Sequence, residues 1–407
     1  MNRVVITGIG IYSCIGQRAD DVRDALFQGK SGIGFDPVRK EFGFRSGLTG
    51  IIPPPDLKDL LTRRQRIGLA EAAEYAVVAT EEALAGARID SDYLDKHDIG
   101  LLYGNDSSAQ GVVDGIDALR AKKDTTLIGS GSIFQSMNST VTMNLATIYR
   151  IKGINFTVSA ACASGSHAIG LGYFLIRHGL QERIICGGAQ EVNLYSMASF
   201  DGLSAFSVRE DAPAKASRPF DKDRDGLVPS GGAATLILES YESAKHRGAP
   251  IYGEVIGYGY SSNGAHISQP SIEGPAKSLE MSLRDAGISP ADVGYINAHA
   301  TSTPIGDRSE AQAIDQVFGT AKPLLSSTKS MTGHECWMAG ASEIVYSLLM
   351  MQSAFVAPNI NFEEGDEITC KLNIVRETLE MPFEIFLSNS FGFGGTNSSL
   401  IVKKVKE

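Results

Sequence analysis

The chain has 407 residues and a mass of 43.4 kDa, so two units of similar size or one large fused core are expected. Hydrophobic residues make up 43% and charged residues 21%, a globular composition that excludes disordered and fibrous proteins. The net charge is −10, from 37 basic and 47 acidic residues, which argues against a nucleic-acid-binding surface.

The cysteines and the apolar segments favour a cytoplasmic protein with no membrane partner. The five cysteines lie far apart and none has CxxC spacing, so a disulfide framework or a structural zinc site is not expected. Residues 1–8 lack the apolar core of a signal peptide and are typical of a first strand. Residues 338–357 carry one charge, Glu343, but their polar side chains favour a buried helix over a membrane span.

Short apolar strands alternate with longer helices along the chain, which is typical of an α/β protein. The strand that runs into Cys162 is followed by a helix with its stop signal at Gly179. The strands expected in the first half cover 4–6, 99–103, 154–158, 184–186 and 235–238, and the helices cover 19–28, 69–87 and 163–178.

The second half of the chain repeats the apolar pattern of the first. Val4–Ser13 is echoed by Glu254–Ser262, and Asp98–Leu102 is echoed by Asp292–Ile296. The echo predicts two duplicated halves, 1–250 and 251–407. No low-complexity linker separates them, so we expect the halves to share one packed core.

Two segments imitate ligand-binding motifs but favour structural roles. Gly8-Ile9-Gly10 follows a strand, yet the third glycine of a dinucleotide fingerprint is replaced by Ser13, so a tight turn is expected. Asp221–Gly226 resembles the start of a calcium loop, but its twelfth position is Gly232 instead of glutamate. We expect a structural loop held by its own Asp and Arg side chains.

Cys162 lies between a strand and a helix and is flanked only by small residues. A helix N-terminus lowers the pKa of a nearby thiol and favours the nucleophilic thiolate, and small neighbours leave room for a substrate. A buried cysteine that fills a strand–helix junction is the alternative, and the local sequence does not separate the two.

Two histidines shift the balance toward a catalytic site. His299 follows a strand in a turn rich in hydroxyl groups, and His334 precedes the apolar helix over 338–355. A helix N-terminus disfavours imidazolium, so His334 is expected to stay neutral and to donate a hydrogen bond. Together the two side chains fit a site that binds a developing oxyanion.

Three further features belong near these histidines. Lys329 and Glu343 each lie among small or apolar residues, and because a lone buried charge is costly, we expect them to pair with one another or with a bound cation. Asn389–Asn397 is a glycine-rich segment after a strand over 383–387, and its Phe391 and Phe393 are suited to gating an apolar channel.

These residues together resemble the β-ketoacyl-[acyl carrier protein] synthases, in particular the elongating type I/II condensing enzymes with a Cys-His-His triad. The resemblance covers essentially the whole chain. It is carried by Ala-Cys-Ala-Ser-Gly around Cys162, Arg-Pro-Phe-Asp-Lys-Asp-Arg-Asp-Gly at 218–226, His-Ala-Thr-Ser-Thr-Pro-Ile-Gly-Asp at 299–307 and Lys-Ser-Met-Thr-Gly-His at 329–334. It implies the thiolase fold, an α/β architecture with duplicated halves in a five-layered αβαβα core, and a homodimer.

The resemblance also implies a reaction and its partner, acyl carrier protein. Cys162 would take an acyl chain as a thioester, and decarboxylation of malonyl-[acyl carrier protein] would give an enolate that attacks it, forming 3-oxoacyl-[acyl carrier protein] in fatty acid elongation. His299 and His334 would stabilise the enolate oxygen, and the backbone N–H groups of Cys162 and Phe393 would form the oxyanion hole.

The remaining implied roles concern support and substrate binding. Lys329 and Glu343 would be the supporting pair, and no cofactor is expected beyond the carrier protein's phosphopantetheine arm, apart from a sodium or potassium ion. The implied substrate-binding residues are Thr301, Thr303, Phe391, Met137 and Trp337, and the implied cation ligands are Asn297, Glu343, Ser388 and Asn389.

The chain departs from the family pattern near the acyl pocket. Asn105–Ser108 stands where a glycine-rich run is usual, and Trp337 stands where relatives place a small residue. Either Trp337 fills a gap left by smaller residues elsewhere, or it narrows the passage and restricts the enzyme to short, rigid or unsaturated primers. A specialised ketosynthase of a polyene or polyketide pathway is therefore the main alternative. A non-catalytic, chain-length-type partner subunit is a second one, against which the presence of Cys162 argues.

Overall fold

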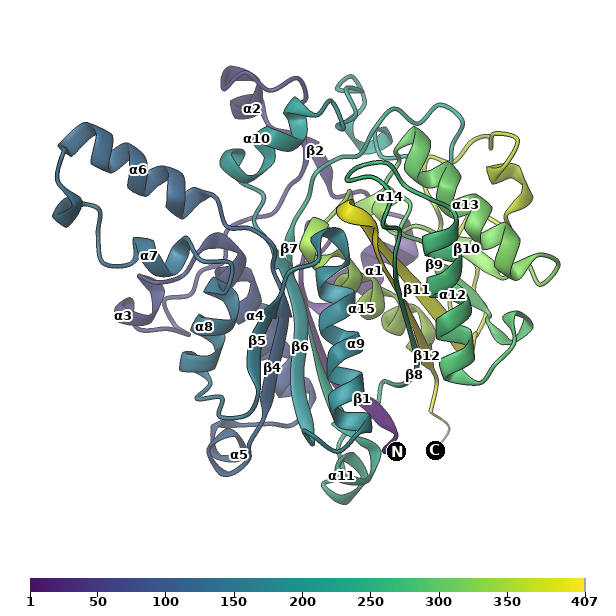
Figure 1. Ribbon diagram of the computed structural model, residues 1–407, viewed down its shortest axis with the longest axis horizontal. Helices are drawn as coiled ribbons and strands as arrows, with labels where there is room; N and C mark the ends of the chain where they lie inside the picture. Colours follow the sequence, from purple (N-terminus) through teal and green to yellow (C-terminus); the bar gives the residue numbers. More distant parts are fainter. Residues whose placement is uncertain (406–407) are drawn as a thin grey trace.

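The computed structural model describes residues 1–405, in which one large mixed sheet is covered and divided by helices (Figure 1). The strands are β1 (Val4–Tyr12), β2 (Ile33–Phe35), β3 (Leu48–Gly50), β4 (Gly100–Gly104), β5 (Asn155–Val158), β6 (Arg183–Gln190), β7 (Gly232–Ser240), β8 (Gly253–Ser262), β9 (Tyr295–Asn297), β10 (Leu324–Ser326), β11 (Ile385–Gly392) and β12 (Thr396–Lys403). β2 and β3 pair separately as a small antiparallel ribbon.

The helices of the described residues vary from single turns to four turns. They are α1 (Ala19–Gln28), α2 (Pro37–Glu41), α3 (Arg63–Arg66), α4 (Glu71–Gly86), α5 (Ser91–Lys96), α6 (Gln110–Lys122), α7 (Ser132–Gln135), α8 (Thr140–Ile148), α9 (Ser164–Arg177), α10 (Leu194–Gly202), α11 (Tyr241–His246), α12 (Glu273–Ala286), α13 (Pro304–Phe318), α14 (Lys329–Thr332) and α15 (Ala339–Gln352). The predicted elements are all present, but β1, β6 and β7 extend well beyond the predicted 4–6, 184–186 and 235–238, and the strand predicted over 383–387 is β11.

The sheet is built from two copies of one topology, as the sequence echo predicts. Its strand order is β10-β9-β11-β12-β8-β1-β7-β6-β4-β5. Each half contributes five strands, β1 and β4–β7 from the first and β8–β12 from the second. Numbered in chain order within a half, both sets are arranged third, second, fourth, fifth, first. In each half the third and fourth strands flank the second and are parallel to it, and the fifth is antiparallel to both its neighbours. Short antiparallel pairing of β1 with β8 joins the halves. The division at residue 250 stays a prediction.

Glycines in β1 and β8 explain both the echo and an error in the sequence analysis. Gly8 and Gly10 do not form the predicted tight turn, because β1 continues through them to Tyr12. A Cβ atom at either position would collide with a backbone carbonyl oxygen of α4. Gly257 and Gly259 of β8 face α12 in the same way. These glycines therefore let one helix of each half lie directly on its first strand.

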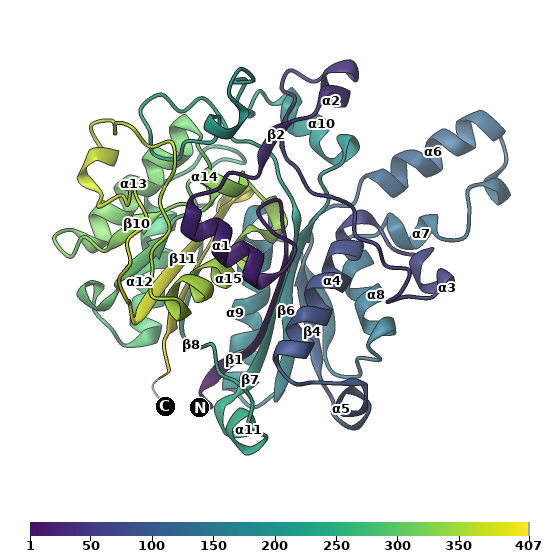
Figure 2. The same cartoon turned by 180° about the vertical axis from the view of Figure 1, so that it is seen from behind.

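The helices form layers around the two halves of the sheet (Figures 1 and 2). α4 packs on β1 and β7 on the outer side of the first half, and α12 packs on β8 and β12 on the outer side of the second half. α9 and α15 contact one another between the two half-sheets, which gives the five layers of the thiolase fold. Every residue from Ala339 to Met351 is buried, so the apolar segment is the predicted core helix, and none of the helices in residues 1–405 is both long and apolar enough to cross a membrane.

The structure contradicts one loop prediction and agrees with another. The segment over 389–397 is mostly strand, because β11 keeps its pairing with β12 as far as Gly392, and only a short turn at Phe393–Gly395 separates them. The loop over 221–226 has the predicted structural role. Its Asp221 accepts from Arg218 at 2.9 Å, and Arg224 donates to the carbonyl oxygens of Thr303 and Pro304.

The close packing of α4 on β1 predicts a large effect of one methyl group. Gly10→Ala places a Cβ against the carbonyl oxygen of Ala79, so the free energy of unfolding should fall by about 1–3 kcal/mol. Gly202→Ala is the matched control, since no atom lies within 4 Å of its added Cβ. Urea unfolding of both variants measures the difference, and equal stabilities would contradict this account of the glycines.

Candidate active site

Cys162 lies at a sharp turn between the first half's third strand and the central helix α9. The chain leaves β5, and Ala161 takes a left-handed conformation with φ 47°, a strained geometry for a residue with a side chain. Ser164 holds the turn by accepting from the Ala160 N–H at 2.8 Å and donating to the Ala161 carbonyl at 2.6 Å. Cys162 is 5% exposed and lines a cavity of about 350 Å³.

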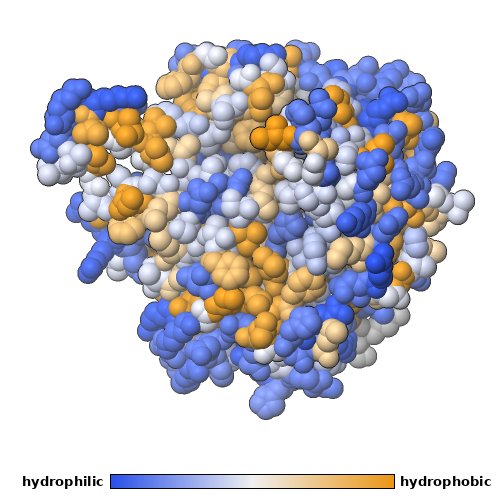
Figure 3. Space-filling view, viewed as in Figure 1, coloured by the Kyte–Doolittle hydropathy of each residue, from blue (hydrophilic) through white to orange (hydrophobic). Residues whose placement is uncertain are grey.

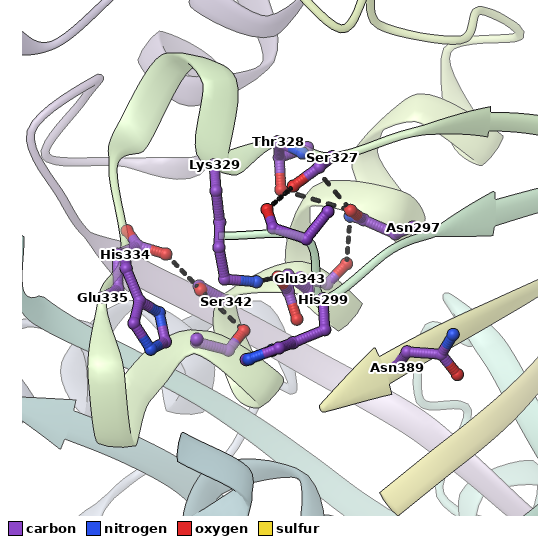
Figure 4. Close-up of polar contacts among 12 residues, drawn as sticks. Asn297, His299, Ser327, Thr328, Lys329, His334, Glu335, Ser342, Glu343 and Asn389 are labelled. Atoms are coloured by element: carbon purple, nitrogen blue, oxygen red, sulfur yellow. Dashed lines mark hydrogen bonds and ion pairs between the residues drawn. The ribbon is translucent and has the colours of Figure 1, made fainter. Parts of the chain in front are cut away.

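The two predicted histidines meet Cys162 in this cavity. His299 follows β9, and His334 lies in the connection between α14 and α15. The Nε2 atom of His334 is 3.1 Å from the Cys162 Sγ, and the two imidazole rings are 5.4 Å apart at 88°. Figure 4 shows the rings pointing toward one another, with the Lys329 side chain beside them. Three side chains distant in sequence thus surround one reacting space.

The thiol of Cys162 is not activated as the sequence predicted. Burial raises its pKa to about 12, and the positive charge of Lys329 and the backbone N–H groups of Phe393 and Cys162 itself only partly offset this. Desolvation is the largest cause, so the lowering expected from a helix N-terminus is wrong for the resting site. The backbone N–H groups of Phe393 and Cys162 lie near the sulfur, and their role as an oxyanion hole stays a prediction.

Both histidines are neutral in this environment. Burial and then the charge of Lys329 lower the pKa of His334 well below its usual value, and the same two causes followed by His334 lower the pKa of His299. The direction agrees with the neutral His334 expected from the sequence, although burial rather than the helix dipole is the main cause. The Nδ1 atoms of both rings have no hydrogen-bond partner among the described residues.

Lys329 and Glu343 form the predicted ion pair. Lys329 begins α14, Glu343 lies in α15, and the lysine Nζ contacts Glu343 Oε1 (Figure 4). Each side chain is 1% exposed, so both charges are removed from water. Removing one partner of such a pair leaves an uncompensated buried charge.

Two buried glutamates were missed by the sequence analysis. Glu310 of α13 accepts from the backbone N–H groups of His299 at 2.9 Å and Ala300 at 2.6 Å, so it holds the turn that carries the histidine. Glu335 accepts from Tyr346 at 2.7 Å and from Ser342. Glu310 lies on an amphipathic helix face and Glu335 is the residue next to His334, but nothing in the sequence marks either as buried.

The predicted cation ligands do not form a ready set of oxygen atoms. Asn297 Oδ1 accepts from Thr328, and Asn389 Oδ1 accepts from Ser399 at 2.9 Å. Ser388 is buried within β11, and Figure 4 shows Asn389 set apart from Asn297 and Glu343. Among the oxygen atoms of these four side chains, Glu343 Oε2 is buried without a partner in the described part of the chain, and a sodium or potassium ion at these residues stays a prediction.

The implied substrate-binding residues divide between three places. Thr301, Thr303, Phe391 and Phe393 line the same cavity as Cys162, and the two threonine hydroxyls are 3.1 Å apart. Trp337 lies behind the cavity wall in the apolar cluster that contains Cys162. Met137 is 43% exposed and lies outside the cavity, beside β5 on the molecular surface.

The buried glutamates predict a specific pH dependence of stability. Burial raises the pKa of Glu335 to about 7, from 4.5 in the unfolded chain, so over this window the folded state keeps a proton that the unfolded state has lost. Its contribution to the free energy of unfolding therefore falls as pH rises, by up to about 1.4 kcal/mol per pH unit.

Glu335→Gln removes the titrating carboxyl group but keeps one oxygen that can accept a hydrogen bond from Tyr346 or Ser342. Relative to this variant, the wild type should lose stability between pH 5 and pH 7, measured by urea unfolding. The exposed Glu380→Gln variant should run parallel to the wild type. A constant difference between the wild type and Glu335→Gln across this range would show that Glu335 does not titrate there.

Comparison with known proteins agrees with this geometry. The family model described as Beta-ketoacyl synthase, N-terminal domain, matches residues 1–244, and the one described as Beta-ketoacyl synthase, C-terminal domain, matches residues 252–363. The chain is 40% identical to 3-oxoacyl-[acyl-carrier-protein] synthase 1 of Escherichia coli (strain K12) over 410 residues, covering 100% of both proteins.

Solved structures give the same result. A β-ketoacyl synthase from Burkholderia phymatum STM815 superposes with a TM-score of 0.94 at 37% identity, covering 100% of both chains. The AntDE:AntF complex, a type II PKS acyl-carrier protein with its ketosynthase bound to the hexaketide, contains a chain that matches with a TM-score of 0.88 at 30% identity and the same coverage. The chain has the thiolase fold and belongs to the β-ketoacyl synthase family of condensing acyltransferases.

Proposed function

We propose that this protein condenses malonyl-[acyl carrier protein] with an acyl group held on Cys162, giving 3-oxoacyl-[acyl carrier protein] in fatty acid elongation. The observation that carries the proposal is the meeting of one buried thiol with two neutral imidazoles in a single cavity. Family membership and the name of the Escherichia coli relative support the same reaction.

The first half-reaction loads the enzyme. The Cys162 sulfur attacks the acyl thioester of the carrier protein, the N–H groups of Cys162 and Phe393 receive the carbonyl oxygen, and the departing pantetheine sulfur takes up the thiol's proton. Because the pKa of the thiol is raised, the thiolate forms only as the attack proceeds, with His334 Nε2 at 3.1 Å from the sulfur.

The second half-reaction forms the carbon–carbon bond. The malonyl group loses carbon dioxide, and the electron pair of the broken bond gives an enolate whose oxygen accepts from His299 and His334. The enolate carbon attacks the acyl carbonyl, and the Cys162 thiolate leaves and takes up one proton. Both histidines serve as neutral donors, which their lowered pKa values support.

Of the two alternative functions, one keeps the condensation reaction and the other lacks it. A specialised ketosynthase of a polyene or polyketide pathway would differ only in its primer. A non-catalytic, chain-length-type partner subunit would need no complete triad, so the assembled Cys162, His299 and His334 argue against it.

The five cysteines are free thiols, which supports the proposed cytoplasmic location.

Acyl carrier protein is the proposed partner. The cavity that holds Cys162 is lined by Thr301 and Thr303, whose paired hydroxyls suit the amides of a phosphopantetheine arm. The similar AntDE:AntF structure is described as a carrier protein bound to its ketosynthase. No cofactor beyond that arm is proposed.

A homodimer is the proposed assembly. β5 is an edge strand of the sheet, and its Phe156 is 43% exposed. Figure 3 shows apolar side chains gathered on the neighbouring arm of α6 and α7, where Ile133 and Phe134 are 60% and 48% exposed. An unpaired edge beside such a patch favours pairing with a second copy, which would also bring Met137 to the interface.

The role of Cys162 is tested by substitution and mass measurement. Incubation with acyl-[acyl carrier protein] should add one acyl group to the wild type, mapped to Cys162, and none to Cys162→Ser. Condensation by Cys162→Ser should fall below detection. A serine variant that condenses at a near-normal rate would end the proposal, whereas residual malonyl decarboxylation would not, because that step uses the histidines.

His299 and His334 are expected to act on the enolate rather than on acyl loading. Loss of one oxyanion donor typically slows a reaction by about 10²–10³-fold. His299→Ala and His334→Ala should each reduce carbon dioxide release from malonyl-[acyl carrier protein] by this factor while much of the acylation of Cys162 remains. An equal loss of both partial reactions would instead indicate a folding defect or activation of the thiol.

The homodimer is tested at its proposed edge. Light scattering during chromatography should give twice the chain mass for the wild type and the single-chain mass for Phe156→Lys. Phe42→Lys is the control, because Phe42 is 62% exposed just after α2, away from the arm and β5. If the wild type and Phe156→Lys have the same mass in solution, β5 is not part of the interface.

A further inference from the structure

Phe200 and Phe393 line the cavity beside Cys162, and the rings of Phe206 and Trp337 pack against Phe200. Phe200 of α10 lines the cavity together with Cys162 and Phe393, and its ring centroid lies 6.0 Å from that of Phe393 and 6.3 Å from that of Phe206. The ring planes of Phe393 and Phe206 are tilted from that of Phe200 by only 22° and 12°. We call Phe200, Phe206, Phe393 and Trp337 the aromatic wall.

Trp337 closes the wall from behind and is held in place. Its ring lies 6.1 Å from that of Phe200, and it is 6% exposed. Its Nε1–H donates to the Ser107 hydroxyl at 3.3 Å. Its backbone is packed against Gly165 and Gly188, where an added Cβ would lie 3.0 and 2.8 Å from the Trp337 carbonyl oxygen. The indole therefore cannot withdraw without breaking these contacts.

The aromatic wall borders one part of the cavity, because Phe200 and Phe393 line it while Phe206 and Trp337 lie behind them. The 350 Å³ cavity extends toward Thr301 and Thr303, the side suited to the pantetheine arm. Trp337, Phe206 and Met197, at 6%, 2% and 1% exposure, fill the apolar cluster around Cys162. An acyl chain on the sulfur thus meets ring faces instead of an open aliphatic tunnel.

We propose, on the basis of the proposed function, that this site selects acyl primers that are flat and conjugated next to the thioester carbonyl, namely enoyl, polyenoyl or aroyl groups, over saturated chains of the same length. A conjugated chain is thin and stiff, so it can lie against nearly parallel rings in an offset stack. A saturated chain is thicker and must give up several rotatable bonds to fit the same space.

The test compares primers in matched pairs on acyl carrier protein. But-2-enoyl is paired with butanoyl, and octa-2,4,6-trienoyl with octanoyl, each with malonyl-[acyl carrier protein] as extender. The wild type should show kcat/KM about tenfold higher for the flat member of each pair, within the range over which apolar sites discriminate. A ratio of one or below for both pairs would overturn the proposal.

Three variants assign the selection to the aromatic wall. Trp337→Leu and Phe200→Leu keep apolar bulk but remove a ring, and Ser107→Ala removes the anchor of Trp337. The ratio should fall toward one in the two leucine variants and part of the way in Ser107→Ala. Phe27→Leu, on α1, is the control that should keep the wild-type ratio. An unchanged ratio in all three variants would place the selection elsewhere.

The outcomes separate this inference from the proposed function. A protein that condenses none of the four primers, and releases no carbon dioxide from malonyl-[acyl carrier protein], contradicts the proposed function. A protein that condenses saturated primers as well as flat ones keeps the proposed function and loses only the selection. If Trp337→Leu fails to fold, the wild-type ratio and the Phe200→Leu and Ser107→Ala variants still decide.

Discussion

The buried ion pair between Lys329 and Glu343 determines how the other ionisable groups of the site can coexist. Burial raises the pKa of Glu310 and Glu335 to about 7 and also raises that of Glu343, and the positive charge of Lys329 lowers all three. The same charge lowers the pKa of both histidines and opposes the rise at Cys162. Because charges interact strongly where water is excluded, one lysine acts on every group around it.

The duplicated fold explains how residues from distant segments reach that lysine. Each half contributes the loops that follow its parallel strands, and ligands bind at the carboxyl ends of such strands. The first half supplies Cys162 after β5, and the second half supplies His299 after β9 and Lys329 after β10. The antiparallel β1–β8 pairing and the contact of α9 with α15 bring these edges together. One half alone therefore contains only part of the chemistry.

The sequence was informative wherever chemistry or periodicity is local. Strands, helices and the echo between halves follow from apolar patterns, and the pairing of Lys329 with Glu343 follows from the cost of isolated buried charges. The thiol pKa could not be predicted, because it depends on how deeply tertiary packing buries Cys162. Gly10 was misjudged for a related reason, since a glycine needed for helix packing has the same sequence signature as one in a turn. Glu310 was missed because a carboxylate on an amphipathic helix usually faces water.

Burial acts on the two kinds of catalytic group in opposite directions and leaves both neutral. It raises the pKa of the Cys162 thiol and lowers the pKa of His299 and His334. In the proposed reaction this has a consequence for the malonyl carboxylate. A free cation beside it would stabilise the ground state and so slow the loss of carbon dioxide, because only interactions stronger in the transition state accelerate a step. The nearby cation Lys329 is already engaged by Glu343, and the neutral imidazoles offer donors where the enolate charge develops. In the proposed reaction the pairing with Glu343 therefore keeps Lys329 from acting as a free counter-ion to the malonyl carboxylate.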